Sequence, residues 1–211
     1  MKNVRQIKCL IFVLSALWAL ILLAQGIVVP LSFFMPLNYI VLAALMIIFA
    51  FDKWMWKWRP IRLIFSIHTP VLIGTWKGTL LSNWINPATG SGIPPINAFL
   101  SVTQTYSFIN VKLLTRESSS DLLNGTIDEN KGTFRLLGTY LNEPRMSVRD
   151  RSQIHFGSIA ISVHEGNPPL LEGKYWTDRD TKGEMHFDQR INDLYTSFED
   201  CEKAFANTGK Q

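Results

Sequence analysis

The hydrophobic pattern divides the chain into an apolar N-terminal part and a longer part in which apolar and polar residues alternate. No charged side chain lies between Lys8 and Asp52, and two apolar runs of 21 residues, Cys9–Val29 and Leu31–Phe51, fill this interval. A helix rises about 1.5 Å per residue and satisfies its own backbone hydrogen bonds in lipid, so each run is long enough to cross a bilayer. The pattern predicts two transmembrane helices joined as a hairpin by a short link at Pro30–Pro36.

Beyond residue 70, short runs rich in β-branched and aromatic residues are separated by clusters of Gly, Pro, Asn, Asp and Ser. Most of these links are too short for a helical crossover, so the strands must be antiparallel neighbours. Closing such a sheet removes its exposed edges. We therefore predict an eight-stranded antiparallel up-and-down β-barrel with strands at Val71–Leu81, Ile96–Ser107, Ile109–Arg116, Asp121–Ile127, Thr133–Leu141, Ile154–Val163, Leu170–Thr177 and Glu184–Arg190.

The C-terminal tail predicts one short helix. The sequence Thr196–Glu199 fits a capping box, and Phe198, Cys201 and Phe205 would share one helical face. The expected organisation is a transmembrane hairpin over residues 1–52, a membrane-interface connector over 53–67, a cytoplasmic barrel over 68–191 and a helical tail over 192–211.

The distribution of charge agrees with a membrane anchor. Residues 1–62 contain seven Lys and Arg against one acidic residue, whereas the rest of the chain contains 14 against 16. Basic residues flank both ends of the predicted hairpin and its link carries none, so the positive-inside rule places both termini in the cytoplasm. Trp54, Trp56 and Trp58 alternate with basic residues and predict an aromatic belt above anionic lipid. The balanced remainder gives no support for a surface that binds duplex nucleic acid.

A secretory signal peptide is the alternative interpretation of the first apolar run. Ala24–Gly26 is a weak cleavage site, but the run is longer than the usual hydrophobic region of about 7–15 residues, and a second apolar run follows. The two cysteines, Cys9 and Cys201, cannot form a disulfide framework or a Cys-based metal site, which fits a reducing cytoplasm.

The alternation of the strands places polar side chains inside the predicted barrel, together with aliphatic ones. Among them are Gln104, Tyr106 and Gln189, besides a group that gathers at the mouth far from the membrane. The longest loops, Ser82–Pro95, Asn142–Gln153 and Asp178–Gly183, border this mouth and bring several arginines. Tyr rings stack on bases and Arg pairs with phosphate, so the mouth suits a planar, anionic ligand. The candidate ligand-binding residues are Tyr140, Arg145, Arg149, Arg151, His155, Tyr175, Thr177 and Arg179. The alternative is that these side chains only close the end of a filled barrel.

The sequence Gly-Thr-Trp-Lys-Gly at Gly74–Gly78 resembles the first strand of lipocalins and fatty-acid-binding proteins. In such barrels the tryptophan closes one end, often beside an arginine of the last strand. The resemblance implies this role for Trp76 and Arg190, and it specifies no ligand.

A longer set of motifs extends over nearly the whole chain. Two apolar spans precede the Gly-x-Trp-x-Gly motif, and these are followed by Tyr140-x-Asn142-x-Pro144, His155-x-Gly157 and Leu171-x-Gly173-x-Tyr175-Trp176-Thr177-x-Arg179-x-Thr181-x-Gly183. This set resembles the two-transmembrane, β-strand-rich effectors associated with CD-NTase enzymes in bacterial anti-phage signalling (CBASS). The resemblance implies a bacterial inner-membrane protein whose barrel binds a cyclic (di)nucleotide, made by a partner CD-NTase, as its activator and without another cofactor. The barrels would then self-associate as a homo-oligomer and cluster their hairpins, disrupting the membrane and causing cell death or growth arrest.

The residues alone leave three alternatives to compare with a receptor: an enzyme, a lipid carrier and a structural oligomeriser. The histidines at positions 68, 155, 164 and 186 lack the His-Glu-x-x-His spacing, and no Gly-x-Ser-x-Gly or Gly-Lys-Ser/Thr motif occurs, so we expect no enzyme and no metal site. A membrane-tethered carrier of lipid or fatty acid would need a mostly apolar lumen with one partner for a carboxylate. A purely structural oligomeriser would have a filled barrel.

Overall fold

The computed structural model describes residues 12, 15–20, 24, 31–85, 89–130, 132–166 and 168–208. The chain forms two compact units, Met1–Phe49 and Ala50–Gln211. The first predicted span, Cys9–Val29, and Pro30 lie largely outside the described residues. In the part of the chain that is described, no helix combines the length and the apolar character needed to cross a membrane.

Helix α2 spans Leu31–Lys53. The predicted link over Pro30–Pro36 is therefore wrong from Leu31 onward. Pro36 is the sixth residue of α2, so its missing N–H removes one hydrogen bond within the helix without ending it.

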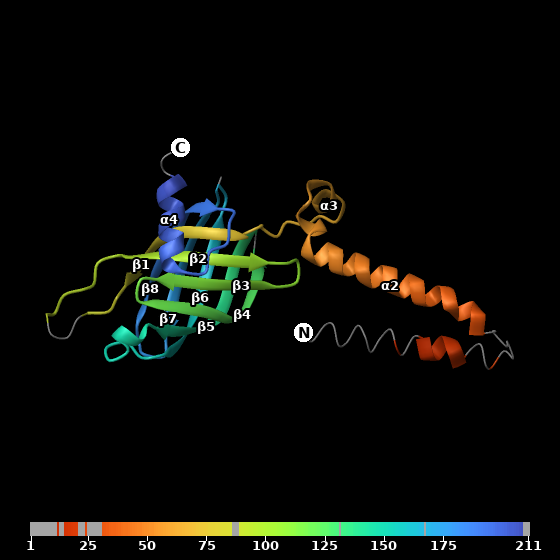
Figure 1. Cartoon of the computed structure of the whole chain (residues 1–211), viewed down its shortest axis with the longest axis horizontal. Coiled ribbons are helices and arrows are strands. Elements are labelled where there is room, and N and C mark those ends of the chain that lie inside the picture. Colours follow the sequence, from red (N-terminus) through yellow and green to blue (C-terminus); the bar gives the residue numbers. More distant parts are fainter. Residues whose placement is uncertain are drawn as a thin grey trace. The chain divides into compact units, whose positions relative to one another are not determined.

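The second unit contains a closed barrel in which each strand pairs with the next along the chain and β8 pairs with β1 (Figure 1). All pairs are antiparallel, so the predicted eight-stranded up-and-down barrel is confirmed. The strands are β1 (Gly74–Ser82), β2 (Ile96–Gln104), β3 (Ile109–Thr115), β4 (Ser118–Asn130), β5 (Thr133–Pro144), β6 (His155–His164), β7 (Leu170–Thr177) and β8 (Lys182–Ile191).

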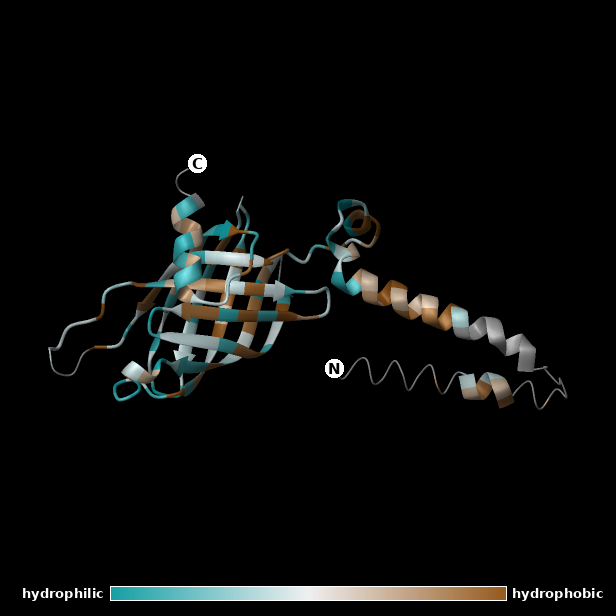
Figure 2. Cartoon of the chain, in the orientation of Figure 1, coloured by the Kyte–Doolittle hydropathy of each residue, from teal (hydrophilic) through white to brown (hydrophobic). Residues whose placement is uncertain are grey.

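The interior of the barrel is packed with large apolar side chains in its central and closed parts. Hydrophobic residues alternate with polar residues along the strands (Figure 2), as expected when one face of each strand is turned inward. The largest fully buried side chains of this cluster belong to Trp76, Phe187, Leu72, Leu100, Leu136, Ile161 and Leu171.

A β-bulge changes the alternation at the end of β8. The pairing with β1 shifts between Lys77 and Gly78, and Asp188 is the extra residue. The shift leaves Gln189 exposed, so the prediction that Gln189 faces the interior is wrong. Arg190 is half-buried in its place, with its guanidinium carbon 5.2 Å from the centre of the Trp76 ring.

Trp76 and Arg190 close one end of the barrel, as the resemblance to lipocalins implies. The Trp76 indole N–H donates to the carbonyl of Leu72 at 2.9 Å. The Arg190 guanidinium donates to the carbonyls of Val71 and Ile73, so the chain that enters β1 is bound to the last strand. This cation also stacks on the ring face, which adds a cation–π attraction.

The connector before the barrel consists of a 3-10 turn, η1 (Met55–Lys57), and a short helix, α3 (Arg59–Ile64). Trp54 and Trp58 are exposed, but Trp56 is fully buried, so the prediction that Trp56 belongs to an aromatic belt is wrong. Tyr106 packs beside Trp56, with ring centres 6.2 Å apart. Tyr106 is half-exposed and lies beyond β2, because the chain turns at Thr105–Phe108, so its predicted interior position is also wrong.

The last residues of α2 contact the same turn. The backbone carbonyl of Asp52 accepts a hydrogen bond from the N–H of Tyr106 at 2.9 Å, and its carboxylate accepts one from the N–H of Ser107 at 2.8 Å. The Phe51 ring packs edge-on against Tyr106. The turn between β2 and β3 is thus fastened to residues 51–56.

Helix α4 (Phe198–Thr208) confirms the predicted C-terminal helix, and Phe198, Cys201 and Phe205 share its buried face. Its cap begins one residue later than predicted. The hydroxyl of Ser197 accepts the N–H of Asp200 at 3.2 Å and donates to the Asp200 carboxylate at 2.7 Å. Ser197 and Asp200 therefore replace Thr196 and Glu199 as the capping pair, and Glu199 is left for other contacts.

We predict that Trp76→Ala destabilises the barrel by about 3–5 kcal/mol, because it empties a fully buried site and leaves Arg190 without its aromatic partner. The free energy of unfolding, measured by urea denaturation of the full chain, checks this. Trp176→Ala is the matched control, since Trp176 is 50% exposed and its loss should cost less than about 0.5 kcal/mol. Equal losses in the two variants would contradict the closing role of Trp76.

Candidate functional site

A cavity of about 670 Å³ opens at the end of the barrel opposite Trp76, where β5 and β7 end and β6 and β8 begin. Most of the predicted site residues meet there, whereas Arg145 and Arg149 are not part of the lining. The predicted residues that line the cavity are Tyr140, Arg151, His155, Tyr175, Thr177 and Arg179.

Two tyrosines lie flat against the cavity wall because each faces a glycine on the neighbouring strand. Tyr140 of β5 is opposite Gly157 of β6, and Tyr175 of β7 is opposite Gly183 of β8. A Cβ atom on either glycine would overlap the ring of its tyrosine. The glycines thus let the rings cover the wall and leave space in the centre of the cavity.

Burial raises the pKa of Tyr140, and the charge that Tyr175 would carry as a phenolate raises it further. The phenol of Tyr140 is therefore neutral and can donate a hydrogen bond at physiological pH. Its ring offers an apolar face, and its hydroxyl offers a polar tip in the same cavity.

Three polar side chains of β4, β5 and β6 lie next to one another at the cavity, and of these only His155 was predicted as a site residue. The hydroxyl of Ser120 donates to the amide oxygen of Asn142 at 2.9 Å, and the amide nitrogen of Asn142 lies 3.4 Å from Nδ1 of His155. All three side chains are buried and line the cavity. Asn142 follows Tyr140 by two residues, so it faces the same side; it was missed because β5 was expected to end at Leu141 and extends to Pro144.

The tautomer of His155 follows from its backbone contact. Nδ1 lies 3.0 Å from the carbonyl oxygen of Gln153, which only accepts hydrogen bonds, so Nδ1 carries the proton and Nε2 is an acceptor. Burial lowers the pKa of His155; the contact with Gln153 opposes this shift and the charge of Arg179 reinforces it. His155 is accordingly neutral at pH 7.

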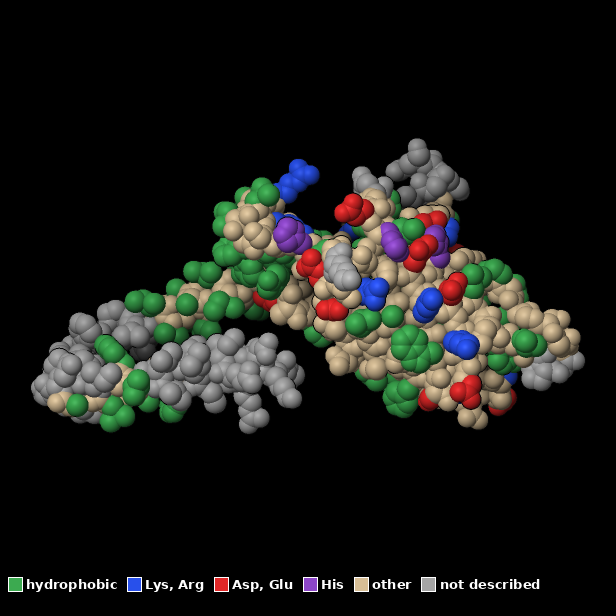
Figure 3. All heavy atoms as spheres, turned by 180° about the vertical axis from the view of Figure 1, so that it is seen from behind, with side chains coloured by type: hydrophobic (Ala, Val, Ile, Leu, Met, Phe, Trp, Pro, Cys, Tyr) green, Lys and Arg blue, Asp and Glu red, His purple; other side chains and the backbone are tan. Residues whose placement is uncertain are grey.

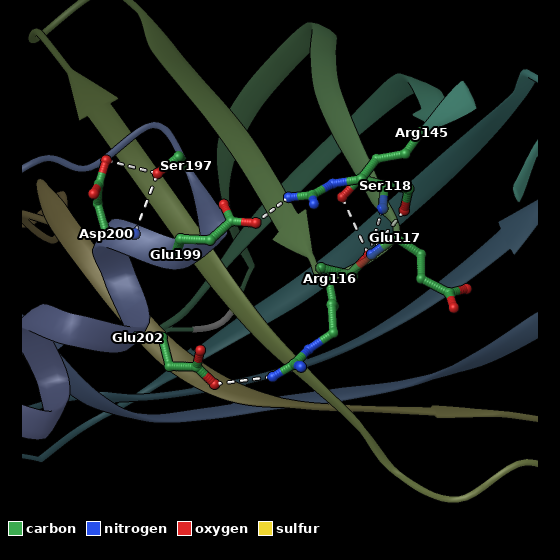
Figure 4. A network of polar contacts seen from close by, with 9 residues as sticks. Arg116, Glu117, Ser118, Arg145, Ser197, Glu199, Asp200 and Glu202 are labelled. Carbon is green, nitrogen blue, oxygen red and sulfur yellow. Dashed lines mark hydrogen bonds and ion pairs between the residues drawn. The ribbon is translucent and has the colours of Figure 1, made fainter. Parts of the chain in front are cut away.

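The arginines of the rim are held by oxygen acceptors of other segments. Arg151 pairs with Glu117 and Arg145 pairs with Glu199, each with an N–O distance of 2.5 Å (Figure 4 draws the second pair). The hydrogen bond from Arg145 lowers the pKa of Glu199. Arg149 donates through Nε to the carbonyl of Pro144 at 3.3 Å, which accounts for its position outside the cavity lining.

The β7–β8 loop holds the remaining predicted residues. The hydroxyls of Thr177 and Thr181 lie 2.7 Å apart, and the backbone N–H of Arg179 donates to the Thr177 hydroxyl at 3.3 Å. These bonds fix the loop that places Arg179 at the cavity. Trp84 and Arg116 also line the cavity. The loop Ser82–Pro95 was predicted to border the mouth, but Trp84 was not named as a candidate, and the β3–β4 turn that carries Arg116 was not considered.

The arrangement combines aromatic faces, hydrogen-bond donors and acceptors, and cations around one space, which is suited to binding a polar aromatic anion. Among the described residues, no group of three His, Cys, Asp or Glu side chains is placed to hold a metal ion. On the face of the barrel in Figure 3, basic and acidic side chains are interspersed. Attraction for an anion therefore depends on the local charges of the mouth.

Comparisons with known proteins point in one direction. Residues 67–189 match the family model described as Cap15, cyclic dinucleotide receptor domain. CD-NTase-associated protein 15 from Staphylococcus schleiferi is 28% identical over 149 residues, which are 71% of this chain and 76% of that protein. The region matched by the family model contains β1 to β7 and nearly all of β8.

We predict that the barrel loses stability as the pH falls below about 6.5, because the unfolded chain binds a proton at His155 more readily than the folded barrel does. The stability that neutral His155 contributes is complete above the pKa of the unfolded histidine. It is lost as the pH falls through the lowered pKa of His155 in the folded state. Urea midpoints between pH 5 and pH 8 check this, and His155→Gln should flatten the profile there. His68→Gln, which alters an exposed histidine outside the cavity, is the control; an unchanged profile for His155→Gln would contradict the assignment.

Proposed function

This chain belongs to the Cap15 cyclic dinucleotide receptor family, and from this premise we propose that its cavity binds a cyclic dinucleotide as a signal. The observation that carries the proposal is the lining of the cavity. Two tyrosines, a neutral histidine and several arginines surround one space. Receptor function, with no reaction catalysed, is part of the proposal.

Polar and cationic groups set into a largely apolar cavity favour this function over carriage of a lipid. A fatty-acid carrier needs a mostly apolar lumen with one cationic partner for a carboxylate. Here Ser120, Asn142 and His155 form a buried polar row in the cavity, and Arg151 and Arg179 both line it. A nucleotide offers partners for each of these groups, whereas an alkyl chain would leave the polar row unpaired at a cost.

In the proposed complex each part of the ligand meets a different part of the cavity. The rings of Tyr140 and Tyr175 contact the bases. Arg151 and Arg179 pair with the phosphates, for which the guanidinium group has a matching geometry. Asn142 and Nε2 of His155 face the polar edge of a base. Arg145 and Arg149, which are not part of the lining, support the position of the rim through Glu199 and the carbonyl of Pro144.

We expect the full chain in detergent to gain thermal stability from at least one member of a panel of 3′,3′-cyclic di-AMP, cyclic di-GMP and cyclic UMP–AMP. A ligand that binds only the folded state adds about 2.7 kcal/mol to the free energy of unfolding at a concentration 100 times its Kd. Arg151→Ala and Arg179→Ala should each weaken binding by about 10- to 100-fold, the range for a lost hydrogen bond to a charged group.

Arg135→Ala is the matched control for these variants, because Arg135 is exposed on β5 and lies outside the cavity lining. It should leave the affinity unchanged. Stabilisation by oleate and by no nucleotide would replace the receptor proposal with the lipid carrier. Stabilisation by neither would favour a structural oligomeriser.

We extend the proposal to the output of the receptor. The relative from Staphylococcus schleiferi is named as a CD-NTase-associated protein, which supports a CBASS effector whose messenger comes from a partner CD-NTase. The apolar runs Cys9–Val29 and Leu31–Phe51 support anchorage in the bacterial inner membrane with both termini in the cytoplasm. Ligand-dependent self-association of barrels confined to a plane would then bring hairpins together and disrupt the membrane.

Anchorage is tested by extracting bacterial membranes that contain the full chain with alkaline carbonate, from which we expect the chain in the pellet. Replacing Leu42 and Leu45 by Arg should move it toward the supernatant, since each central Arg costs about 2.5–3.5 kcal/mol of insertion free energy. Leu63→Arg in the connector, where the side chain is exposed, is the control and should stay in the pellet. A wild-type chain found in the supernatant would contradict the proposed anchor.

A further inference from the structure

Helix α4 covers an apolar strip on the outer wall of the barrel beside the mouth. Phe99 of β2 and Leu114 of β3 are directly opposite each other and point outward, yet both are buried. The rings of Phe198 and Phe205 lie 5.2 and 5.6 Å from the ring of Phe99, measured between centres. Removing α4 would therefore expose an apolar surface on a wall that is otherwise turned to water.

The first turn of α4 is tied to the rim of the cavity. Phe198 itself lines the cavity. Glu199 accepts a hydrogen bond from Arg145, which follows the end of β5, and Glu202 pairs with Arg116 of the β3–β4 turn at 3.2 Å. Figure 4 shows both pairs reaching from the helix to the barrel. The helix is thus in contact with the same rim that the proposed ligand would enter.

The segment Arg145–Ser152, which we call the arginine turn, links this tether to the cavity. Its backbone is hydrogen-bonded internally, from the N–H of Val148 to the carbonyl of Arg145 at 3.0 Å and from the N–H of Arg151 to the carbonyl of Val148 at 3.1 Å. Arg145 at one end holds Glu199, and Arg151 at the other end lines the cavity and holds Glu117. Arg151 and Arg145 thus stand at the two ends of one hydrogen-bonded turn, and the backbone N–H of Arg145 also donates to the carbonyl of Glu117 at 2.8 Å.

The ion pair of Arg151 with Glu117 can be exchanged for a pair with a ligand phosphate, and the ion pair of Arg145 with Glu199 can break at little cost. The side chains of these two ion pairs are half-exposed or more, and such pairs contribute little free energy. Carboxylate and phosphate offer arginine the same paired-oxygen geometry, and a cyclic dinucleotide carries two phosphates. The cap of α4 is formed by Ser197 and Asp200 without Arg145, so loss of the Arg145–Glu199 tether leaves the helix folded and held at the rim by the Glu202–Arg116 pair alone.

From these contacts we propose that α4 is a latch that reports occupancy of the cavity. The phosphates of a bound cyclic dinucleotide draw Arg151 away from Glu117, the arginine turn shifts, Arg145 releases Glu199, and α4 loosens from the strip formed by Phe99 and Leu114. The inference rests on the proposed function, because it names what binding at that site changes elsewhere in the barrel.

Cys201 is a built-in reporter for this motion. It lies fully buried on the inner face of α4, and burial raises the pKa of its thiol to about 11, so a thiol reagent reaches a reactive thiolate there only when the helix loosens. The sequence contains one other cysteine, Cys9, which Cys9→Ser removes. The experiment follows the reaction of a disulfide reagent with the full-length Cys9→Ser chain in detergent, and measures binding of the cyclic dinucleotide panel by thermal shift in the same samples.

We expect a saturating cyclic dinucleotide to accelerate the reaction of Cys201. Without ligand, Glu199→Gln should accelerate it by about two- to five-fold, the equilibrium factor that an exposed ion pair represents, and ligand should then add little. Glu202→Gln is the matched control on the same helix. It loosens the Arg116 contact and raises the basal rate, but it should preserve the acceleration by ligand, because Arg145 still holds Glu199.

The outcomes separate the latch from the receptor. A ligand that stabilises the chain but leaves the reaction of Cys201 unchanged would overturn the latch and keep the receptor. Failure of Glu199→Gln to alter the basal rate would also overturn the latch, whatever the ligand does. If no cyclic dinucleotide of the panel stabilises the chain, the proposed function fails and the latch fails with it.

Discussion

Pairing of β8 with β1 is the constraint on which the rest of this molecule depends. It closes the sheet and leaves no strand edge, and it brings Arg190 of the last strand onto Trp76 of the first. The bulge at Asp188 is necessary for this contact, because it exchanges the direction of Gln189 and Arg190. One end of the barrel is then filled by an indole, a guanidinium group and the chain that enters β1, and a cavity remains at the other end.

The open end keeps its space because small residues stand where large ones would fill it. Gly157 and Gly183 face Tyr140 and Tyr175 across the strands, and each ring occupies the place of the missing side chain. The same rings would project into the centre of the cavity if their neighbours carried a Cβ atom. A filled barrel and a receptor barrel can therefore have nearly the same strand pattern, and a few glycines decide between them.

Charge at the mouth is arranged so that the arginines are already engaged. Glu117 of the β3–β4 turn lines the cavity and Glu199 belongs to helix α4 outside it, and both pair with arginines of one short hydrogen-bonded turn. Such half-exposed pairs orient the guanidinium groups without holding them strongly. An anionic ligand thus meets guanidinium groups that are already oriented. When these groups pair with the ligand, the β3–β4 turn and helix α4 lose their ion-pair partners. This exchange of partners connects the inside of the barrel with its outer wall.

Much of this architecture follows from the sequence alone, because strand alternation, turn residues and a Gly-x-Trp motif are local signals. They were enough to predict eight antiparallel strands, closure, and a cavity lined by Tyr140, His155 and Tyr175, while the resemblance of the Gly-x-Trp motif to lipocalins implied the pairing of Trp76 with Arg190. The long uncharged runs likewise predict a membrane anchor from composition. Tertiary structure alone decided where alternation breaks, since a bulge or a turn depends on the partner strand: Gln189 and Tyr106 were placed inside and lie outside. It also decided that Trp56 is buried, that Asn142 joins the cavity and that Arg145 reaches α4, because contacts between distant segments leave no periodic trace in the chain.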